Sequence, residues 1–507
     1  MKTKVQQIWE KRKRRIEGRL RKARMLGDRG RPVMTPGAVR CELSERTRAT
    51  SHGGLAAIHQ MVGKVGLAKR IDNQVHVLKV HRPYHVSDHV LSIAYNAMCG
   101  GQRLEDIELL RNDEAFLDML GAEAIPDPTT AGDFCRRFEI PHIEALHAAV
   151  NETRQEVWKR SGLSQREATA RIDADGTIVP TIGECKQGMG LSYKGEWGYH
   201  PLLISLANTA EPLFLVNRSG NRPSSEGAAA YFDKAIALCR DGGFKDILLR
   251  GDTDFMQTAH LDRWHEDGVR FIFGYDARKN LVARADGLPE SLYRELERRA
   301  EGAFATKAQR QTQPRVKEEI VRANNYRNIR LRSEDVAEFT YSPIACKREY
   351  RIVVVRKNLT IEKGMTALFD ETRYFFYITN DSKLSAEEVV REANHRCNQE
   401  NLIAQLKGGV HALRAPVNTL NANWAYMLIS SLAWTFKAWA ALLLPIHPAW
   451  RERHSAEREQ WLRMEFRTFC NAVIRVPAQI LNTGRRLVLR VLSWRAQLPA
   501  LCRLLNV

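Results

Sequence analysis

Residues 169–180 read Thr169-Ala-Arg-Ile-Asp-Ala-Asp-Gly-Thr-Ile-Val-Pro180, and apolar and polar side chains alternate along this stretch. A period of two predicts a β-strand with one buried face. Upstream, from Ser51 to about Gly162, apolar residues recur at three- and four-residue spacing, which predicts helices. The change of period near residue 168 therefore marks the start of a second type of domain.

Strands and helices follow this first strand in mixed order. Further strands are predicted after residue 200, at 246–250 and at 269–274, and helices at 228–239 and 259–265. Such an order is typical of an α/β domain in which helices flank a mixed sheet. We therefore expect an α/β fold from about residue 166 onward.

A long segment, 276–372, separates these elements from a further predicted strand at 374–379. A loop of that length without structure is uncommon, so we expect an inserted β-rich subdomain there. The helical domain is expected to bind DNA, although an ordinary helical domain is equally compatible with its sequence. The expected division is a basic arm (1–50), a helical domain (51–165), a first core segment (166–275), the insertion (276–372), a second core segment (373–445) and a basic helical C-terminal region (446–507).

The charge of the chain points to a polyanionic partner. Its 507 residues carry 78 Lys and Arg against 59 Asp and Glu, a formal net charge of +19, and residues 1–32 hold thirteen basic residues against three acids. A basic segment of this kind favours nucleic acid or an anionic membrane surface. The longest apolar run, 428–447, is interrupted by Lys437 and Pro445, which predicts a core helix rather than a membrane span. Nucleic acid is therefore the expected partner.

Two common kinds of site have no sequence signal. The nine cysteines are scattered and include no C-x-x-C pair, which argues against a disulfide framework and a structural zinc site. Neither a phosphate-binding loop nor the glycine-rich dinucleotide motif is present. No nucleotide cofactor is therefore expected.

Two aspartates fall at the ends of predicted strands. Asp175 ends the first strand, and Asp252 follows the strand 246–250 directly after Gly251. In open α/β sheets, sites assemble at strand ends. With 59 acids in the chain, however, two such positions also arise by chance, and both aspartates could serve as caps of turns or helices.

A third acid lies on a predicted helix. Ser385 and Glu388 form a capping box, and the helix is expected to run to about Lys407. At 3.6 residues per turn, Glu400 lies about 40° and Lys407 about 20° around the helix from Arg396, so all three share one face. The alternative is a solvated stripe with an Arg–Glu pair of little energetic weight.

The segment Arg396-x3-Glu400-x6-Lys407 resembles the Y-x2-R-x3-E-x6-K signature of one branch of DDE-type insertion-sequence transposases. Residues 173–177, 249–255 and 398–403 also resemble the three catalytic blocks of insertion-sequence family 1380. The resemblance runs from about Ser51 to Arg490. The position of the signature tyrosine holds Ala393.

The resemblance implies an RNase-H-like core with a β-rich insertion. It implies that Asp175, Asp252 and Glu400 are the catalytic residues and hold two Mg²⁺ ions, for which Mn²⁺ should substitute. Oxygen ligands suit Mg²⁺, and a pair of hard cations stabilises both the attacking and the leaving oxygen of a phosphodiester in an in-line displacement. The fallback ligands are Asp173, for Asp175, and Asp254, for Asp252.

The resemblance implies a DNA transposase of the bacterial cytoplasm, associated with the nucleoid. The enzyme would bind the terminal inverted repeats of its element, hydrolyse the ends and join the 3′-hydroxyl to target DNA, with Arg396 and Lys407 contacting DNA phosphates. Because two ends must be cut together, a homodimer on DNA is expected. The alternatives are a transposase-derived DNA-binding regulator without catalysis and an RNase-H-like structure-selective nuclease.

Overall fold

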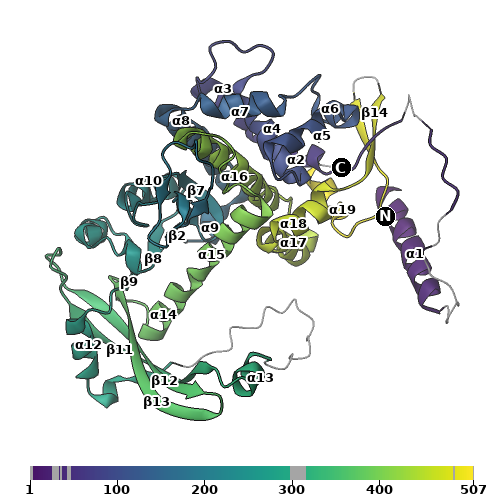
Figure 1. Ribbon diagram of the computed structural model, residues 1–507. Coiled ribbons are helices and arrows are strands. Elements are labelled where there is room, and N and C mark those ends of the chain that lie inside the picture. The colour runs from purple at the N-terminus through teal and green to yellow at the C-terminus, as the bar shows by residue number, and fades with distance from the viewer. Residues whose placement is uncertain are drawn as a thin grey trace.

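The computed structural model describes residues 4–25, 34, 37–42, 47–296, 316–483 and 486–505. It is a mixed α/β protein, with a large sheet in the middle of the chain and helices before and after it (Figure 1). The α/β fold class expected from the sequence is confirmed. The expected arm (1–50) and insertion (276–372) lie partly outside the described residues, and the division into domains stays a prediction.

Helices fill the chain before the sheet, as the sequence predicts. Asp127 caps α7 by accepting a hydrogen bond from the Thr130 amide at 3.0 Å, and α8 ends at Gly162, whose φ of 64° suits glycine. The helices are α1 (Lys4–Met25), α2 (Leu55–Val65), α3 (Leu67–Gln74), α4 (Val86–Cys99), α5 (Ile107–Arg111), α6 (Glu114–Leu120), α7 (Pro128–Arg136), α8 (Ile140–Ser161) and α9 (Leu163–Arg166).

The central sheet has nine strands in the order β10-β11-β12-β13-β9-β8-β2-β6-β7. Strands β2, β8 and β9 run parallel to one another, and every other neighbouring pair is antiparallel. The strands are β2 (Thr169–Gly176), β6 (Leu202–Leu206), β7 (Glu211–Val216), β8 (Asp246–Gly251), β9 (Arg270–Tyr275), β10 (Arg294–Glu295), β11 (Arg327–Tyr341), β12 (Tyr350–Lys363) and β13 (Thr366–Thr379).

Short elements connect these strands. Helix α10 packs against β2, β6, β7 and β8. A separate three-stranded sheet, in the order β3-β5-β4, lies between β2 and β6 in the sequence. These elements are β3 (Val179–Pro180), β4 (Gly190–Leu191), β5 (Trp197–Tyr199), α10 (Ala228–Asp241), α11 (Leu261–Glu266), α12 (Lys279–Asp286) and α13 (Val316–Ala323).

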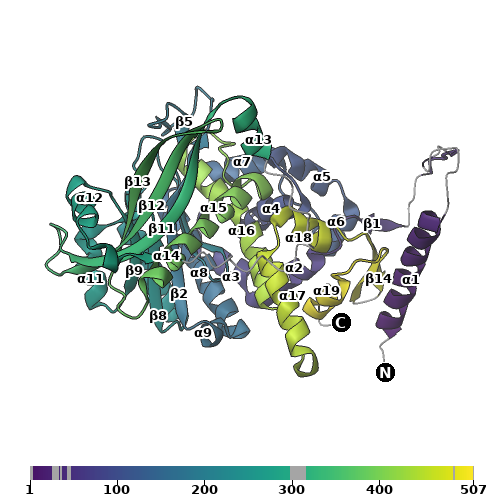
Figure 2. The same cartoon turned by 90° about the horizontal axis from the view of Figure 1, so that it is seen from below.

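The strands of the expected insertion are longer than the sequence indicates. Strands β11, β12 and β13 form a ladder that continues the core sheet, because β13 pairs with β9 at residues 376–379. Figure 2 shows the three strands side by side, with α14 (Ala386–His395) packed along them. Residues 366–375 expose most side chains on both faces, so their sequence lacks the alternation that would have predicted a strand.

The helix expected from Ser385 to Lys407 is wrong in its continuity. The capping box of Ser385 and Glu388 forms, but α14 ends at His395, α15 spans Cys397–Ala404, and Gln405–Gly409 form a π-helical turn. The pair Gly408-Gly409 has low helix propensity, and the Gln405 side chain accepts a hydrogen bond from the Phe466 amide at 2.9 Å. The π-helical turn is thus contacted by Phe466, a residue distant in the sequence.

The C-terminal region adds helices and one β-hairpin. The hairpin of β14 and β15 corrects the expected all-helical region. Strand β14 also pairs with β1 near the start of the chain. The elements are β1 (Arg48–Thr50), α16 (Leu420–Leu442), α17 (Arg451–Arg463), α18 (Phe466–Phe469), β14 (Ala478–Thr483), β15 (Arg486–Val491) and α19 (Leu498–Leu504).

Helix α16 is the buried core helix that the sequence predicts. It contacts α4, α7, α8, α17 and β7 (Figure 1). Lys437, which interrupts the apolar run, is buried, donates to the Leu462 carbonyl at 2.7 Å and lies 3.8 Å from the centre of the Trp434 ring. Burial lowers the pKa of Lys437 to about 7. Among the described residues, no helix is both long and apolar enough to cross a membrane.

Candidate active site

Asp175 and Asp252 lie at the same edge of the sheet because they end neighbouring parallel strands. Asp175 is the penultimate residue of β2, and Asp252 follows β8 directly. Each carboxylate accepts a hydrogen bond from a nearby backbone amide: Asp175 from Gly176 at 2.8 Å and Asp252 from Asp254 at 3.0 Å. The two carboxylates are thereby held at the end of the sheet.

Arg396 brings these aspartates together with Glu400. Its Nη1 lies 3.7 Å from Asp175 Oδ2 and 3.9 Å from Asp252 Oδ2, and its Nη2 lies 3.8 Å from Glu400 Oε1. These separations are too long for direct hydrogen bonds. Arg396 Nη1 is buried and has no hydrogen-bond partner among the described residues. Three acids from three chain segments therefore surround one cation without being bonded to it.

The electrostatics of this set show the cost of gathering acids. Burial, followed by the charge of Asp252, raises the pKa of Asp175 to about 6, although Arg396 acts in the opposite direction. Burial is also the main cause of a raised pKa at Asp252, with Arg396 lowering and Asp254 raising it. Both aspartates therefore favour a nearby positive charge.

The donor set of these acids fits a hard divalent cation. All three side chains offer carboxylate oxygens, the ligands that Mg²⁺ and Mn²⁺ prefer. In the stretches of the chain that the structure describes, no three His, Cys, Asp or Glu side chains stand close enough to hold an ion as they are. The Arg396 guanidinium lies between the carboxylates, so ion binding would require it to move aside. That movement breaks no hydrogen bond of Nη1, which has none among the described residues.

Lys407 joins the site through its charge rather than through a direct ion pair. It lies in the π-helical turn 405–409, where burial lowers its pKa and the charges of Glu196 and Asp175 raise it. The sequence predicts Lys407 on the same helical face as Arg396. Because the helix breaks at Arg396 and residues 405–409 form a wider π-helical turn, the angle expected for a continuous α-helix does not apply.

Asp173 is occupied by another partner. It is 1% exposed, and Arg250 forms a two-pronged ion pair with it, at 2.7 and 2.9 Å. Arg250 also donates to the backbone carbonyl and the carboxylate of Glu392, at 3.1 and 3.0 Å, and Arg171 donates to the same carboxylate. This ion network ties β2, β8 and the last turn of α14 together. Those are the segments that carry Asp175, Asp252 and Arg396.

The other fallback, Asp254, is exposed; its backbone amide binds the Asp252 carboxylate, and its side chain acts on Asp252 through its charge. Next to it the structure adds His200, which the sequence did not single out. Its Nδ1 lies 2.8 Å from the Arg222 carbonyl, and a Cβ on Gly176 would lie 2.9 Å from its Nε2. His200 precedes β6, the antiparallel neighbour of β2. Its position just before a predicted strand was the one sequence feature that could have pointed to the site.

A tyrosine also lies near Arg396, although Ala393 occupies the signature position. Tyr377, on β13, and Ala393, on α14, pack against the same apolar cluster. Burial raises the pKa of Tyr377, and the charge of Arg396 lowers it. The chain thus places a phenol near this guanidinium from a strand about twenty residues upstream, which a linear motif cannot reveal.

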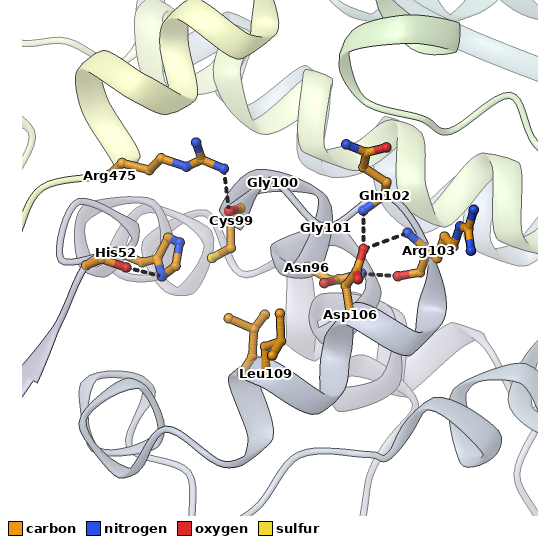
Figure 3. A pocket seen from close by; sticks show the side chains of 12 residues that line it. His52, Asn96, Cys99, Gly100, Gly101, Gln102, Arg103, Asp106, Leu109 and Arg475 are labelled. Carbon is orange, nitrogen blue, oxygen red and sulfur yellow. Dashed lines mark hydrogen bonds between the residues drawn. The ribbon is translucent and has the colours of Figure 1, made fainter.

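A cavity of about 680 Å³ lies elsewhere, between the end of α4 and the C-terminal segment. Figure 3 shows His52, Gln102, Arg103 and Arg475 around it, with Arg475 directed at the Cys99 carbonyl. None of the residues predicted for the active site lines this cavity.

Comparison with known proteins identifies a family and similar solved structures. The sequence model of the family described as Transposase DDE domain group 1 matches residues 43–505. No curated protein matches the chain. A solved piggyBac transposase synaptic complex with hairpin DNA is similar over 85% of this chain and 84% of that chain, with 9% identity and a TM-score of 0.36.

Proposed function

The chain belongs to the Transposase DDE domain group 1 family, and from that membership we propose that it binds the terminal inverted repeats of an insertion sequence, cleaves the ends and joins them to target DNA. The observation that carries the proposal is the convergence of Asp175, Asp252 and Glu400 on Arg396, at 3.7–3.9 Å. Arg396 Nη1 forms no hydrogen bond although two carboxylates lie within 4 Å of it, and a divalent cation would use the oxygens of these acids more fully.

The strand order supports an RNase-H-like core. In this proposal the core is β7-β6-β2-β8-β9. Strand β7 pairs antiparallel with β6, β6 pairs antiparallel with β2, and β2, β8 and β9 are parallel to one another. Asp175 lies near the end of the central strand β2, and Asp252 lies directly after β8, the parallel neighbour of β2. Strands β10–β13 extend this core between the second aspartate and Glu400, where we place the β-rich insertion.

The chain's own residues define the chemistry of the site. Asp175, Asp252 and Glu400 would hold two Mg²⁺ ions, or Mn²⁺ in their place, which stabilise charge on the attacking and leaving oxygens. Arg396 and Lys407 would bind phosphate oxygens beside the scissile bond, Arg396 through its planar fork and Lys407 as a point charge.

The reaction would proceed in two displacements at this one site. In the first, water forms a bond to phosphorus and the P–O3′ bond breaks, which leaves a 3′-hydroxyl and a 5′-phosphate. In the second, that 3′-hydroxyl attacks a phosphodiester of the target strand and displaces its 3′-oxygen. Neither step needs a covalent protein–DNA link. A homodimer would bring the two ends together.

The same residues support a place in the Y-R-E-K branch and in insertion-sequence family 1380. Arg396, Glu400 and Lys407 keep the spacing of the signature, and Ala393 departs from it. In this proposal Tyr377 supplies a phenol from β13 near Arg396, which makes the loss of the signature tyrosine tolerable.

A pair of aspartate variants tests this function. We expect Asp252→Asn to abolish metal-dependent cleavage of DNA that carries the element ends, with end binding kept, because it removes one ligand charge. The matched control is Asp254→Asn, two residues away and exposed, which should still cleave. Gel-shift and cleavage assays on both variants provide the comparison. Equal cleavage by Asp252→Asn would remove this residue from the site, and binding without cleavage by the wild type would favour a DNA-binding regulator.

A further inference from the structure

Two arginines and a histidine meet just beyond the active-site segment. His411 follows the π-helical turn, is 7% exposed and has a left-handed backbone with φ of 61°. Arg414 Nη2 lies 2.9 Å from His411 Nδ1, and Arg467 Nη2, from α18, lies 3.3 Å from His411 Nε2. Both ring nitrogens therefore face a guanidinium group.

The imidazole cannot satisfy both arginines. A neutral imidazole has one acceptor nitrogen and one N–H, whereas a guanidinium offers donors alone. Burial, followed by the charges of Arg414 and Arg467, lowers the pKa of His411 and favours the neutral ring, although a hydrogen bond with the Lys407 backbone acts in the opposite direction. Whichever tautomer forms, one guanidinium N–H points at a ring N–H.

No acid relieves this conflict. Arg414 also donates to the Gln102 carbonyl at 3.1 Å. Over residues 47–296, 316–483 and the other described ranges, no carboxylate lies within ion-pair distance of Arg414 or Arg467. By contrast, Arg453 on α17 pairs with Glu457 at 3.2 Å, as a typical surface arginine does. The arginines of the cluster therefore keep donors for an anion.

The surroundings of the cluster are open to a ligand. Arg467 is exposed, and Gln102, whose carbonyl binds Arg414, lines the 680 Å³ cavity together with Arg103 and Arg475 (Figure 3). His411 lies four residues after Lys407, the proposed phosphate contact of the active site. The cluster is thus linked to the basic cavity through Gln102.

We propose that Arg414 and Arg467 together bind one phosphate of the DNA backbone, outside the catalytic acids, with His411 as the pivot between them. This proposal rests on the proposed function. The phosphate oxygens accept from both guanidinium groups, so one arginine can leave the ring and the donor conflict disappears. The cluster positions DNA and takes no part in the chemistry of cleavage.

The test measures the salt dependence of DNA binding by the full-length chain. Wild type, Arg414→Gln, Arg467→Gln and the double variant are titrated with labelled duplex from the element's own ends at several salt concentrations. We expect the double variant to bind severalfold more weakly, with a slope of log K against log salt reduced by about one, because one phosphate contact is lost. The matched control, Arg453→Gln, should keep the wild-type slope.

Three further arms separate the possible explanations. His411→Gly keeps the left-handed backbone and should weaken binding without lowering the Tm. In cleavage assays the double variant should raise KM and leave kcat unchanged, whereas failure of the wild type to cleave would overturn the proposed function alone. An unchanged slope in the double variant overturns the cluster. A rise in Tm with inorganic phosphate that the double variant loses, without any change in DNA affinity, would assign the cluster to free phosphate and overturn the DNA assignment.

Discussion

Arg396 acts as a substitute cation for the acids around it. It keeps Asp175 and Asp252 from facing each other unscreened, yet it forms no hydrogen bond with either. The raised pKa of Asp175, at about 6, shows that the guanidinium does not fully offset burial and the neighbouring acid. If the proposed function holds, the site is therefore strained in the isolated protein and gains stability when divalent cations bind.

The first prediction concerns the stability that Asp175 costs. Because the folded-state pKa of Asp175 lies above the usual 3.8, folding favours its protonated form and stability is lost as the pH rises from about 4 to about 6. Asparagine cannot ionise, so Asp175→Asn should raise the free energy of unfolding at pH 7 by up to about 3 kcal/mol while abolishing cleavage. Urea unfolding at pH 4 and pH 7 measures the effect, which should be absent at pH 4.

Asp127→Asn is the control of opposite sign. Hydrogen bonds from the Thr130 hydroxyl and amide lower the pKa of Asp127, so its charged form stabilises α7 at pH 7. This variant should lower the free energy of unfolding at pH 7. A loss of stability in Asp175→Asn as well would mean that Asp175 is a structural residue.

Among the helices and strands, the sequence predicted the elements whose start or extent depends on neighbouring residues in the chain. The alternation of residues 169–176 predicted β2, and the capping box of Ser385 predicted the start of α14. The break at Arg396 was not predictable, because it depends on contacts from other elements. Arg250 of β8 binds the last turn of α14, and the Phe466 amide binds Gln405 in the turn that follows α15.

The second prediction concerns the ion network between these elements. Arg250→Gln leaves Asp173 buried without its partner, which should lower the free energy of unfolding by about 3–5 kcal/mol. Because Arg250 ties α14 to β2 and β8, the variant should also need more Mg²⁺ for half-maximal cleavage, even below its unfolding temperature. A magnesium titration of the cleavage rate measures this shift.

The control is Arg263→Gln, which breaks an exposed ion pair with Asp233. It should leave both the stability and the magnesium requirement nearly unchanged. If Arg250→Gln loses stability but cleaves at the wild-type magnesium concentration, the network holds the fold without positioning the acids.

In the molecule as a whole, segments from the first fifty and the last thirty residues contact each other. Strand β1 pairs with β14, and Arg12 of α1 donates to the Val491 carbonyl at 2.7 Å. Figures 1 and 2 show α1 standing off from the rest of the chain beside this hairpin. Lys13 also lies 5.9 Å from the centre of the Trp494 ring, and Trp9 packs against the hydrophobic core. The basic helix thus contacts the C-terminal segment along one side and exposes most of its other side chains to solvent.

The sequence identified the proposed acids, but not their surroundings. The sequence could predict Asp175, Asp252 and Glu400 because strand ends and a motif of fixed spacing are local features. His200, Tyr377 and the partner of Asp173 were not predictable, since each reaches the site through the pairing of strands far apart in the sequence. Long-range pairing is the aspect of a site that a linear pattern does not contain.

The third prediction concerns the basic arm. Deleting residues 1–32 should weaken DNA binding and flatten its salt dependence, because fewer counterions are released when fewer phosphates are neutralised. The deletion also removes the contacts of Trp9, Arg12 and Lys13 with the rest of the chain, so the Tm of the shortened chain is measured as well and binding is titrated well below it. Binding titrations at several salt concentrations measure the slope, and an unchanged slope would mean that the arm does not contact DNA.

The most decisive experiment is cleavage of a supercoiled plasmid that carries the gene with its own flanking DNA. Wild type and Glu400→Gln are compared side by side, with Mg²⁺ and with EDTA. We expect metal-dependent cuts at fixed positions on both sides of the gene for the wild type, and none for Glu400→Gln, although both bind the DNA. Cuts of equal yield by Glu400→Gln, or binding without cleavage under every metal, would refute the proposed transposase site.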